Sequence, residues 1–414
     1  MPINNFPKVT ICLPTYNSGE FLTPAIDSIL EQTFTDFELI ISDDCSTDNT
    51  PEVIRSYLEK DSRIKYLQNS QNLGLFPNWN RCLESASGEY ITVFAQDDLM
   101  LPKNLEQKVK ILDKYQNVGL VTSSIMVVDS ENNYLNWDWA NYAEDKFVNG
   151  EEWVRKNLGE ANPICCPFVL IRRQVLEKVG GKFNDNYAFA ADLELWLKIA
   201  LVADIYFVKE ILGYYRWHEG NKTHSFDDFY QVQEHLQICS NLIDSLNLSD
   251  SELNDWENEV LSRTVKWVSY YRIYRHLERG NFDEALKLCE LLESWRGKSG
   301  KLGIFVQQLG TRVQEILQVN SRLKLEVDKY SAWVKNLEKG KSKLQEDSQK
   351  LHSWVDNLEQ KNSVLEAEKS VLEAEKSVLE AEKSWLESQV KAWMQTAQKY
   401  YQKIKDNGKN RETN

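Results

Sequence analysis

Two pairs of adjacent carboxylates are the side chains whose types and positions in this sequence best suit chemistry. Asp43 and Asp44 follow an apolar run at 37–41, and Asp97 and Asp98 follow another at 90–94. A carboxylate can accept a hydrogen bond from a nucleobase N–H or bridge ribose hydroxyls, but it repels a diphosphate unless a cation lies between them. The two pairs therefore predict a nucleotide site that also holds a metal ion.

Each pair, taken alone, also has a structural interpretation. Asp43 and Asp44 begin the segment D-D-C-S-T-D-N-T, and such segments before a helix commonly provide turns and helix caps. Asp97 and Asp98 could cap a helix that begins after Pro102, although two adjacent carboxylates at the end of a buried strand repel each other and need a compensating charge. The position of the pairs in the fold is needed to choose between these interpretations.

Short strands and helices alternate along the first 225 residues. We expect strands at 8–13, 37–41, 64–67, 90–94 and 119–128, and helices after Asn17, from Thr50 and at 77–87. Asn17 and Glu20 have the N-x-x-E spacing of a capping box. This alternation predicts a parallel, doubly wound α/β sheet, and such sheets bind ligands outside the carboxyl ends of their strands. The residues that follow the first strand are Pro14, Thr15, Tyr16 and Asn17.

The same sequence excludes several classes of protein. The turn after the first strand is not G-x-G-x-x-G and no G-x-x-x-x-G-K-[ST] occurs, which excludes dinucleotide-dependent oxidoreductases and P-loop nucleoside triphosphatases. The net charge of −14 leaves no sequence-independent affinity for nucleic acid or anionic membranes. The seven cysteines form no C-x-x-C pair and no long apolar run predicts a transmembrane segment, so we expect a cytoplasmic protein with reduced thiols.

The rest of the chain is predicted to be helical. Residues 226–318 have helical periodicity without a strand pattern, and residues 319–405 have the heptad pattern of a long coiled-coil helix. Leucine occurs at every seventh position from Leu337 to Leu386, and S-V-L-E-A-E-K is repeated three times at 363–383. Valine and alanine widen the apolar stripe, as in a multi-helix bundle. We expect this helix to bury its stripe in a homo-oligomer or against a partner helix.

Four segments, in order, resemble the motifs of the family 2 glycosyltransferases, which have the GT-A fold. They are V-T-I-C-L-P-T-Y-N, E-L-I-I-S-D-D-C-S-T-D-N-T, N-L-G and G-E-Y-I-T-V-F-A-Q-D-D, and they match over roughly residues 1–130. Cys45 replaces the usual glycine of the second motif, and the last motif reads Q-D-D. The segments at 190–199 and 212–223 are similar to acceptor-side motifs of that family, with Ala191 in the place of a common acid.

The resemblance implies roles for the donor-side residues. Asp44, with Asp43 nearby, would hold the base and ribose. Asp97 would reach the ribose, and Asp98 would ligate Mg²⁺ or Mn²⁺, with His218 as a further metal ligand. The other residues expected to bind substrate are Pro14, Thr15, Tyr16, Asn17, Asn72, Gly74, Arg216 and His218, of which the last two would lie on a loop that closes over the diphosphate.

On the acceptor side, the resemblance makes Asp192 the base that deprotonates the acceptor hydroxyl, with Glu194 as the second candidate. It also implies a domain division. A GT-A domain would occupy residues 1–225, with a nucleotide-binding half at 1–130 and an acceptor half at 131–225. A helical region at 226–318, a coiled coil at 319–405 and a disordered tail at 406–414 would follow.

The implied activity is the metal-dependent, inverting transfer of a sugar from a nucleoside diphosphate to a glycan or other hydroxyl acceptor, in surface polysaccharide synthesis. UDP or dTDP donors are favoured, because a carboxylate can accept their ring N–H. A sugar-nucleotide pyrophosphorylase-like transferase is disfavoured, because the first turn lacks a Gly-rich loop with Lys or Arg for a triphosphate. A coiled-coil scaffold with a nucleotide-sugar-binding but inactive domain stays open, although only Ala191 supports it.

Overall fold

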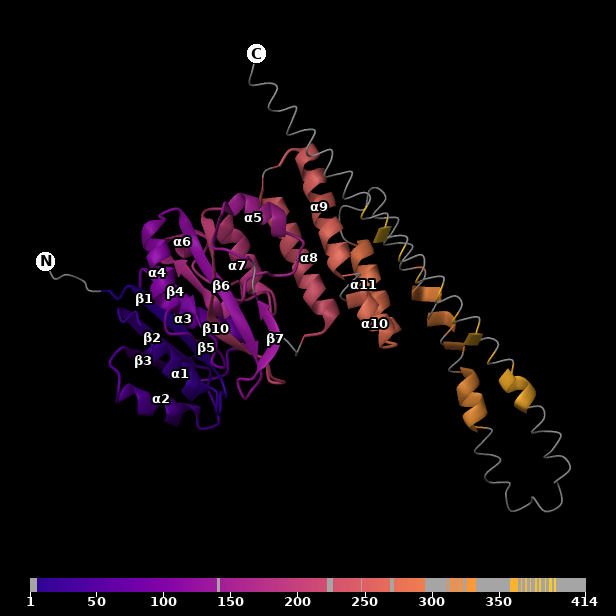
Figure 1. The fold of residues 1–414 in the computed structure, drawn as a ribbon, viewed down its shortest axis with the longest axis horizontal. Coiled ribbons are helices and arrows are strands. Elements are labelled where there is room, and N and C mark those ends of the chain that lie inside the picture. The colour runs from indigo at the N-terminus through magenta and orange to yellow at the C-terminus, as the bar shows by residue number, and fades with distance from the viewer. Residues whose placement is uncertain are drawn as a thin grey trace, which may run out of the picture. The chain divides into compact units, whose positions relative to one another are not determined.

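The apolar, β-branched runs of the first half of the chain form one sheet in the computed structural model (Figure 1). Its strands are β1 (Val9–Thr15), β2 (Phe37–Asp43), β3 (Ile64–Gln68), β4 (Tyr90–Val93), β5 (Leu99–Met100), β6 (Val118–Val128), β7 (Tyr134–Trp139), β8 (Lys146–Val148), β9 (Val169–Arg172) and β10 (Asp204–Arg216). Their order is β3-β2-β1-β4-β9-β6-β10-β5, with β7 beside β6 and β8 beside β10.

The structure describes residues 6–294, apart from 140–141, 222–225, 247 and 269–271, and separate short stretches between 311 and 391. The chain divides into two units, residues 1–320 and residues 321–414. The first unit contains every residue to which the sequence assigns chemistry.

The sheet is mixed rather than parallel throughout. Strands β3, β2, β1 and β4 are parallel, as the sequence predicts. β9 then lies antiparallel between β4 and β6, while β10 is parallel to β6 and antiparallel to β5 and β8. The α/β class is confirmed, but the sequence pattern does not predict β9 or β10. The apolar pattern of β10 is interrupted by Lys209 and Glu210, where its pairing with β6 changes register.

Helices cover both faces of this sheet, because alternate side chains of a strand point to opposite faces. Val9, Ile11 and Leu13 of β1 share one core with α1, α2 and α4, whereas Cys12 belongs to a second core shared with α3, α5, α6 and α7. The bounds are α1 (Leu22–Leu30), α2 (Thr50–Leu58), α3 (Leu75–Ser85), α4 (Asn104–Lys114), α5 (Gly150–Asn157), the 3-10 turn η1 (Cys166–Phe168), α6 (Arg173–Lys178) and α7 (Ala191–Ala200).

Helix α1 begins at Leu22 without a side-chain cap, so the predicted capping box of Asn17 and Glu20 is wrong. Asn17 has a φ of 45°, and its Oδ1 accepts a hydrogen bond of 2.8 Å from the N–H of Thr47. Its side chain therefore joins the loop after β1 to the loop after β2 instead of capping a helix.

The helices that follow the sheet continue the second core. They are α8 (Asp228–Ser245), α9 (Asp250–Val268), α10 (Tyr274–Glu278) and α11 (Phe282–Ser294). Val232, Leu236 and Ile243 of α8 lie in the same hydrophobic cluster as Trp196 of α7 and Val169 of β9. α8 also packs against α9 and α11 (Figure 1). The helical region is thus part of the first unit.

The second unit is described only in part. Most of the leucine series and residues 406–414 lie outside the described residues, so the coiled coil and the disordered tail stay predictions. Nζ of Lys361 lies 5.8 Å from the ring centroid of Tyr330, and both residues are helical. One straight helix would separate these residues by about 46 Å. The prediction of one uninterrupted helix over 319–405 is therefore wrong, because two helical stretches of this unit meet.

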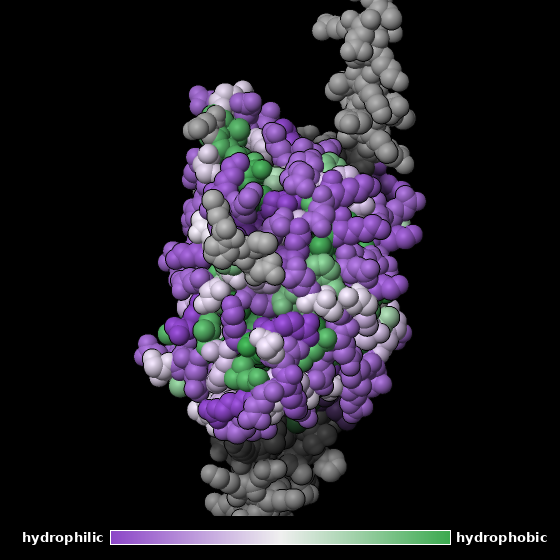
Figure 2. All heavy atoms as spheres, turned by 90° about the vertical axis from the view of Figure 1, so that its left-hand side faces the viewer, coloured by the Kyte–Doolittle hydropathy of each residue, from purple (hydrophilic) through white to green (hydrophobic). Residues whose placement is uncertain are grey.

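The apolar side chains of the strands are buried between sheet and helices. On the face shown in Figure 2, hydrophilic side chains predominate and hydrophobic ones lie in small separate groups. None of the helices in the described part of the chain combines the length and apolar composition of a membrane span.

We expect a chain that ends after residue 320 to fold, and one that ends after residue 225 to fail. The first cut falls between the two units. The second removes the α8 side chains that complete the core, including Val232 and Leu236. Truncation of one large buried side chain costs about 2–5 kcal/mol, and whole domains are stable by only about 5–15 kcal/mol. Calorimetry should show a cooperative transition for residues 1–320 alone. A cooperative transition for residues 1–225 would contradict this account of the core.

Candidate active site

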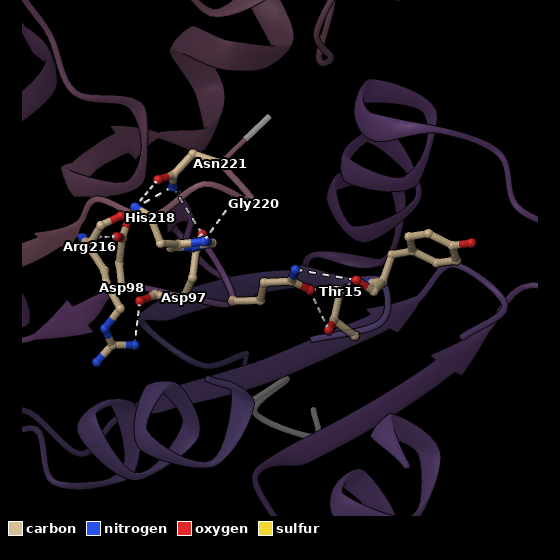
Figure 3. A network of polar contacts seen from close by, with 9 residues as sticks. Thr15, Asp97, Asp98, Arg216, His218, Gly220 and Asn221 are labelled. Carbon is tan, nitrogen blue, oxygen red and sulfur yellow. Dashed lines mark hydrogen bonds and ion pairs between the residues drawn. The ribbon is translucent and has the colours of Figure 1, made fainter. Parts of the chain in front are cut away.

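The carboxyl ends of β1, β2 and β4 meet the end of β10 at one edge of the sheet. β1 ends at Thr15, which pairs with Asp43 of β2, and β4 leads into Asp97 and Asp98. β10 ends at Arg216. Figure 3 shows Asp97 and Asp98 grouped with Arg216 at the end of β10 and His218 just after it, and Thr15 of β1 further along this edge. The predicted position of the site, outside the strand ends, agrees with this arrangement.

Asp98 is completely buried and anchors the end of β10. Its Oδ1 accepts the backbone N–H of Arg216 at 2.8 Å. Burial raises the pKa of Asp98 well above its ordinary value, and the neighbouring charge of Asp97 raises it further.

Arg216 is 2% exposed, and its guanidinium is engaged inside the protein. The guanidinium donates to the carbonyl oxygen of Asp97 and to Oδ1 of Asn132, both at 2.7 Å, and lies 4.9 Å from the ring centroid of Phe21. Arg216 was predicted to cover a diphosphate, but in this structure it supports the loop that carries Asp97.

Asp97 is partly exposed and meets His218 (Figure 3). Its Oδ2 lies 2.9 Å from Nε2 of His218 and accepts from Nδ2 of Asn221 at 3.3 Å. Nδ1 of His218 accepts the N–H of Gly220 at 3.1 Å, which assigns the ring proton of the neutral imidazole to Nε2. The side chains of Asp97 and His218 are 18% and 17% exposed, so a ligand can reach both.

The chemistry of Asp97 and His218 fits a divalent cation. Mg²⁺ and Mn²⁺ accept carboxylate and, for Mn²⁺, imidazole ligands, and they complete their shells with substrate phosphates and water. Among the residues described, no cluster of three or more Asp, Glu, His or Cys side chains suits a metal. Oδ2 of Asp98 has no hydrogen-bond partner in the described part of the chain, yet Asp98 is inaccessible and its Oδ1 is occupied. Because Nε2 of His218 carries the ring proton, His218 orients the carboxylate of Asp97 and is not itself a ligand, contrary to the prediction. The geometry therefore favours Asp97 over the predicted Asp98 as the ligand.

Gln96 fixes the loop that follows β1. Its Oε1 accepts from Oγ1 of Thr15 at 2.7 Å and from the N–H of Tyr16 at 2.8 Å, and its Nε2 donates to the carbonyl oxygen of Tyr16 at 3.3 Å. An amide that both accepts from and donates to one main-chain unit fixes the orientation of that unit. The ring of Tyr16, 43% exposed, is therefore presented to solvent from a fixed backbone.

Asp43 and Asp44 are buried and hold the neighbouring loops. Asp43 accepts a hydrogen bond of 2.9 Å from the hydroxyl of Tyr66. The carboxylate of Asp44 accepts the N–H groups of Leu73 at 2.8 Å and Gly74 at 2.9 Å. Gly74 has a φ of 93°, which glycine adopts without the strain that a Cβ would cause. Asp44 and Gly74 together shape the turn before α3.

Asp192 lies in the first turn of α7, where Asn162 orients it. Nδ2 of Asn162 donates to Oδ2 of Asp192 at 2.9 Å, and the N–H of Leu193 donates to Oδ1 at 2.7 Å. Burial raises the pKa of Asp192 to about 6, because desolvation disfavours the carboxylate more than these hydrogen bonds favour it. Burial raises the pKa of the Cys165 thiol, and the charges of Asp98 and Asp192 raise it further.

Glu194 is occupied by partners of its own. Its Oε1 accepts from Nδ2 of Asn184 at 3.1 Å and forms an ion pair of 2.8 Å with Lys198. Asp192 therefore fits the role of a base better than Glu194 does.

The structure also contains residues at this site that the sequence analysis missed: Gln96, Asn132, Asn162 and Asn221. Gln96 directly precedes Asp97 in one of the motifs, and Asn221 lies in the similar segment at 212–223, so their positions in the motifs could have identified them. Asn132 and Asn162 lie in loops without a motif. Of the remaining predicted residues, Pro14 is buried within β1 and Asn72 is exposed in the turn before α3.

Three comparisons place this architecture among known proteins. The family model described as glycosyl transferase family 2 matches residues 10–180. An uncharacterized glycosyltransferase of Methanocaldococcus jannaschii is 28% identical over 194 residues, which are 46% of this chain and 64% of that protein. The glycosyltransferase EpsE of Bacillus subtilis is 38% identical over 128 residues, which are 31% of this chain and 46% of EpsE.

The fold has a solved counterpart in S. aureus TarS 1–349, crystallised with UDP-GlcNAc. The TM-score is 0.59 at 18% identity, over 76% of this chain and 91% of that one. Residues 10–180 therefore form a glycosyl transferase family 2 domain, and the chain has the GT-A fold that its motifs predict. It spans 64% and 46% of the lengths of the two relatives.

Replacement of Asp98 should destabilise the protein more than replacement of Asp97. Asp98→Ala leaves the buried N–H of Arg216 without an acceptor and opens a cavity, so it should lower the free energy of unfolding by about 2–4 kcal/mol. Asp97→Ala removes contacts that are partly screened by water and should cost less than about 1 kcal/mol. Urea unfolding of both variants measures the difference. Equal losses would show that Asp98 is not the anchor.

Proposed function

We propose that this protein transfers a sugar from a nucleoside diphosphate to a hydroxyl acceptor, with inversion at the anomeric carbon. The observation that carries the proposal is the combination of two features in one GT-A domain. Asp97 and His218 form an accessible pair at the strand ends. Asp192, with a pKa raised to about 6, lies in the first turn of α7 and is oriented by Asn162. The first feature suits the charged end of a donor, and the second suits an acceptor.

On the donor side, the exposed ring of Tyr16 is the surface on which a base would stack. Asp43 is fully buried between the same loops, and Asp44, 3% exposed, is the carboxylate that a base entering there would reach with its N–H. A ring N–H favours a uracil or thymine base, and the binding of UDP-GlcNAc by TarS, which shares the fold, agrees with a UDP donor.

The negative charge of the leaving diphosphate would be balanced by a cation held beside Asp97 and His218. A divalent cation held there would act as a Lewis acid toward the leaving group. Asn221 and Gly220 hold His218 in place through hydrogen bonds, and Arg216 holds the main chain of Asp97. These residues keep the carboxylate of Asp97 and the ring of His218 in position before the donor arrives.

On the acceptor side, Asp192 would accept the proton of the attacking hydroxyl on one carboxylate oxygen. The hydroxyl oxygen would form the new glycosidic bond from the face opposite the leaving diphosphate, which inverts the anomeric centre. Asn162 orients this base, as a third group commonly does. We propose a glycan acceptor, with the product entering a surface polysaccharide.

Donor binding should require a divalent metal ion, and donor affinity should depend on which nucleobase the donor carries. Calorimetry with Mn²⁺ should rank UDP- and dTDP-sugars first, GDP-sugars second and CMP-sugars last, because cytosine lacks the ring N–H. A chelator should weaken donor binding to wild type and to Asp98→Asn. It should have little effect on Asp97→Asn, which has already lost the metal-dependent part of its donor affinity.

Tightest binding of a CMP-sugar would contradict the base assignment. An equal response of all three proteins to the chelator would contradict the ligand assignment. Donor binding without any hydrolysis or transfer would favour the inactive scaffold.

The reaction should depend on Asp192 and on its protonation. Asp192→Asn should leave donor affinity near that of wild type and reduce turnover by about 10² to 10⁴, the usual contribution of a positioned base. Glu194→Gln should cost much less. The base is active when ionised, so the rate should fall about tenfold per pH unit below a midpoint near pH 6.

Asn162→Ala provides the matched test of that midpoint. It removes a hydrogen bond that favours the carboxylate, so the midpoint of the pH–rate profile should move upward. A midpoint near 4, unchanged in Asn162→Ala, would show that another group sets the profile.

A further inference from the structure

A buried glutamate of α8 binds the chain segment that leads into α7. Glu234 is 7% exposed. Its Oε1 accepts the N–H of Ala188 at 2.6 Å, and its Oε2 accepts the N–H groups of Phe189 and Ala190, both at 2.9 Å. Three consecutive main-chain donors thus converge on one carboxylate, and hydrogen bonds to a charged acceptor are the stronger kind.

The arrangement requires a carboxylate rather than any polar side chain. Both oxygens of Glu234 face N–H donors, so neither position can hold a donor itself. A glutamine of the same size would place its NH₂ against at least one of these N–H groups and leave that group unpaired in a buried place.

Two further contacts connect α8 and the residues just before it to the same segment. Nδ2 of Asn241 donates to the hydroxyl of Tyr187 at 2.8 Å. The ring of Phe189 meets the ring of Phe226 edge-on, with centroids 5.6 Å apart. Residues 187–190 are therefore held from α8, which lies beyond the residues matched by the family model, 10–180.

This segment ends where the helix of the base begins. α7 starts at Ala191, directly after Ala190, and Asp192 is its second residue. The direction in which Asp192 projects depends on where the first turn of α7 is placed. Asn162 orients the carboxylate itself, but only if that turn is in position.

We infer that Glu234 is a positioning residue, which fixes the first turn of α7 and thereby aims Asp192 at the acceptor. The inference rests on the proposed function for its catalytic consequence. If the inference is correct, the helical region that begins with α8 is needed for catalysis.

The test compares Glu234→Gln with Glu252→Gln in the full chain. Glu252 is a matched control, because it also accepts hydrogen bonds near the start of a helix of this region, from the N–H and hydroxyl of Ser249 before α9, but far in sequence from any site residue. Hydrogen exchange should speed up at the amides of 188–190 in Glu234→Gln only. Turnover should fall about 10- to 100-fold in that variant, while the donor KM and donor affinity stay within about twofold.

A merely structural role would raise the donor KM and lower turnover together, so the separation of the two is the decisive readout. Glu234→Asp keeps two acceptor oxygens and should recover part of the lost turnover and of the amide protection. Wild-type turnover in Glu234→Gln, or equal exchange at 188–190 in both variants, would overturn the inference. If the wild-type protein has no transferase activity, the proposed function is refuted. The positioning role is then tested by hydrogen exchange alone, and it is refuted if the amides of 188–190 are as well protected in Glu234→Gln as in wild type.

Discussion

The fully buried carboxylate of Asp98 holds the end of β10 to the loop after β4, and the rest of the site depends on this hydrogen bond. Asp98 accepts the N–H of Arg216, and the guanidinium of Arg216 returns to the carbonyl oxygen of Asp97. These contacts join segments that lie 118 positions apart in the sequence. A buried polar group is costly unless it is paired, so the pair strongly favours one position of β10. That position brings His218 and Asn221 to Asp97.

The sequence predicted most of the strands that carry the candidate site, because strand formation depends on local pattern. The apolar runs gave β1 to β4 and β6, and the carboxylates at their ends mark the binding edge of such a sheet. The sequence could not assign different roles to Asp97 and Asp98. The two residues are adjacent in one loop, and they differ only in the residues of distant segments that each contacts. Asn17 shows the same limit: its spacing to Glu20 fits a cap, but Thr47 from another loop takes its side chain. β9 and β10 were missed because one is very short and the other carries charges at a change of register.

The residues that we propose for catalysis come from separate parts of the first unit. The sheet supplies Asp97, the loop after β10 supplies His218, and α7 supplies Asp192 with support from Asn162. α8 completes the arrangement, since Glu234 holds the residues just before α7. Core packing supports the same boundary, because α8 side chains share a cluster with Trp196 of α7.

The central claim is that Asp97, oriented by His218, rather than the adjacent Asp98, holds the cation that meets the donor diphosphate. An anomalous difference map, recorded above the manganese absorption edge from crystals grown with UDP and Mn²⁺, tests it most directly. The account predicts one strong peak in contact with the carboxylate of Asp97, with Nε2 of His218 still hydrogen-bonded to that carboxylate. A peak bound by Asp98 instead, or ordered UDP with no peak beside Asp97, would contradict it.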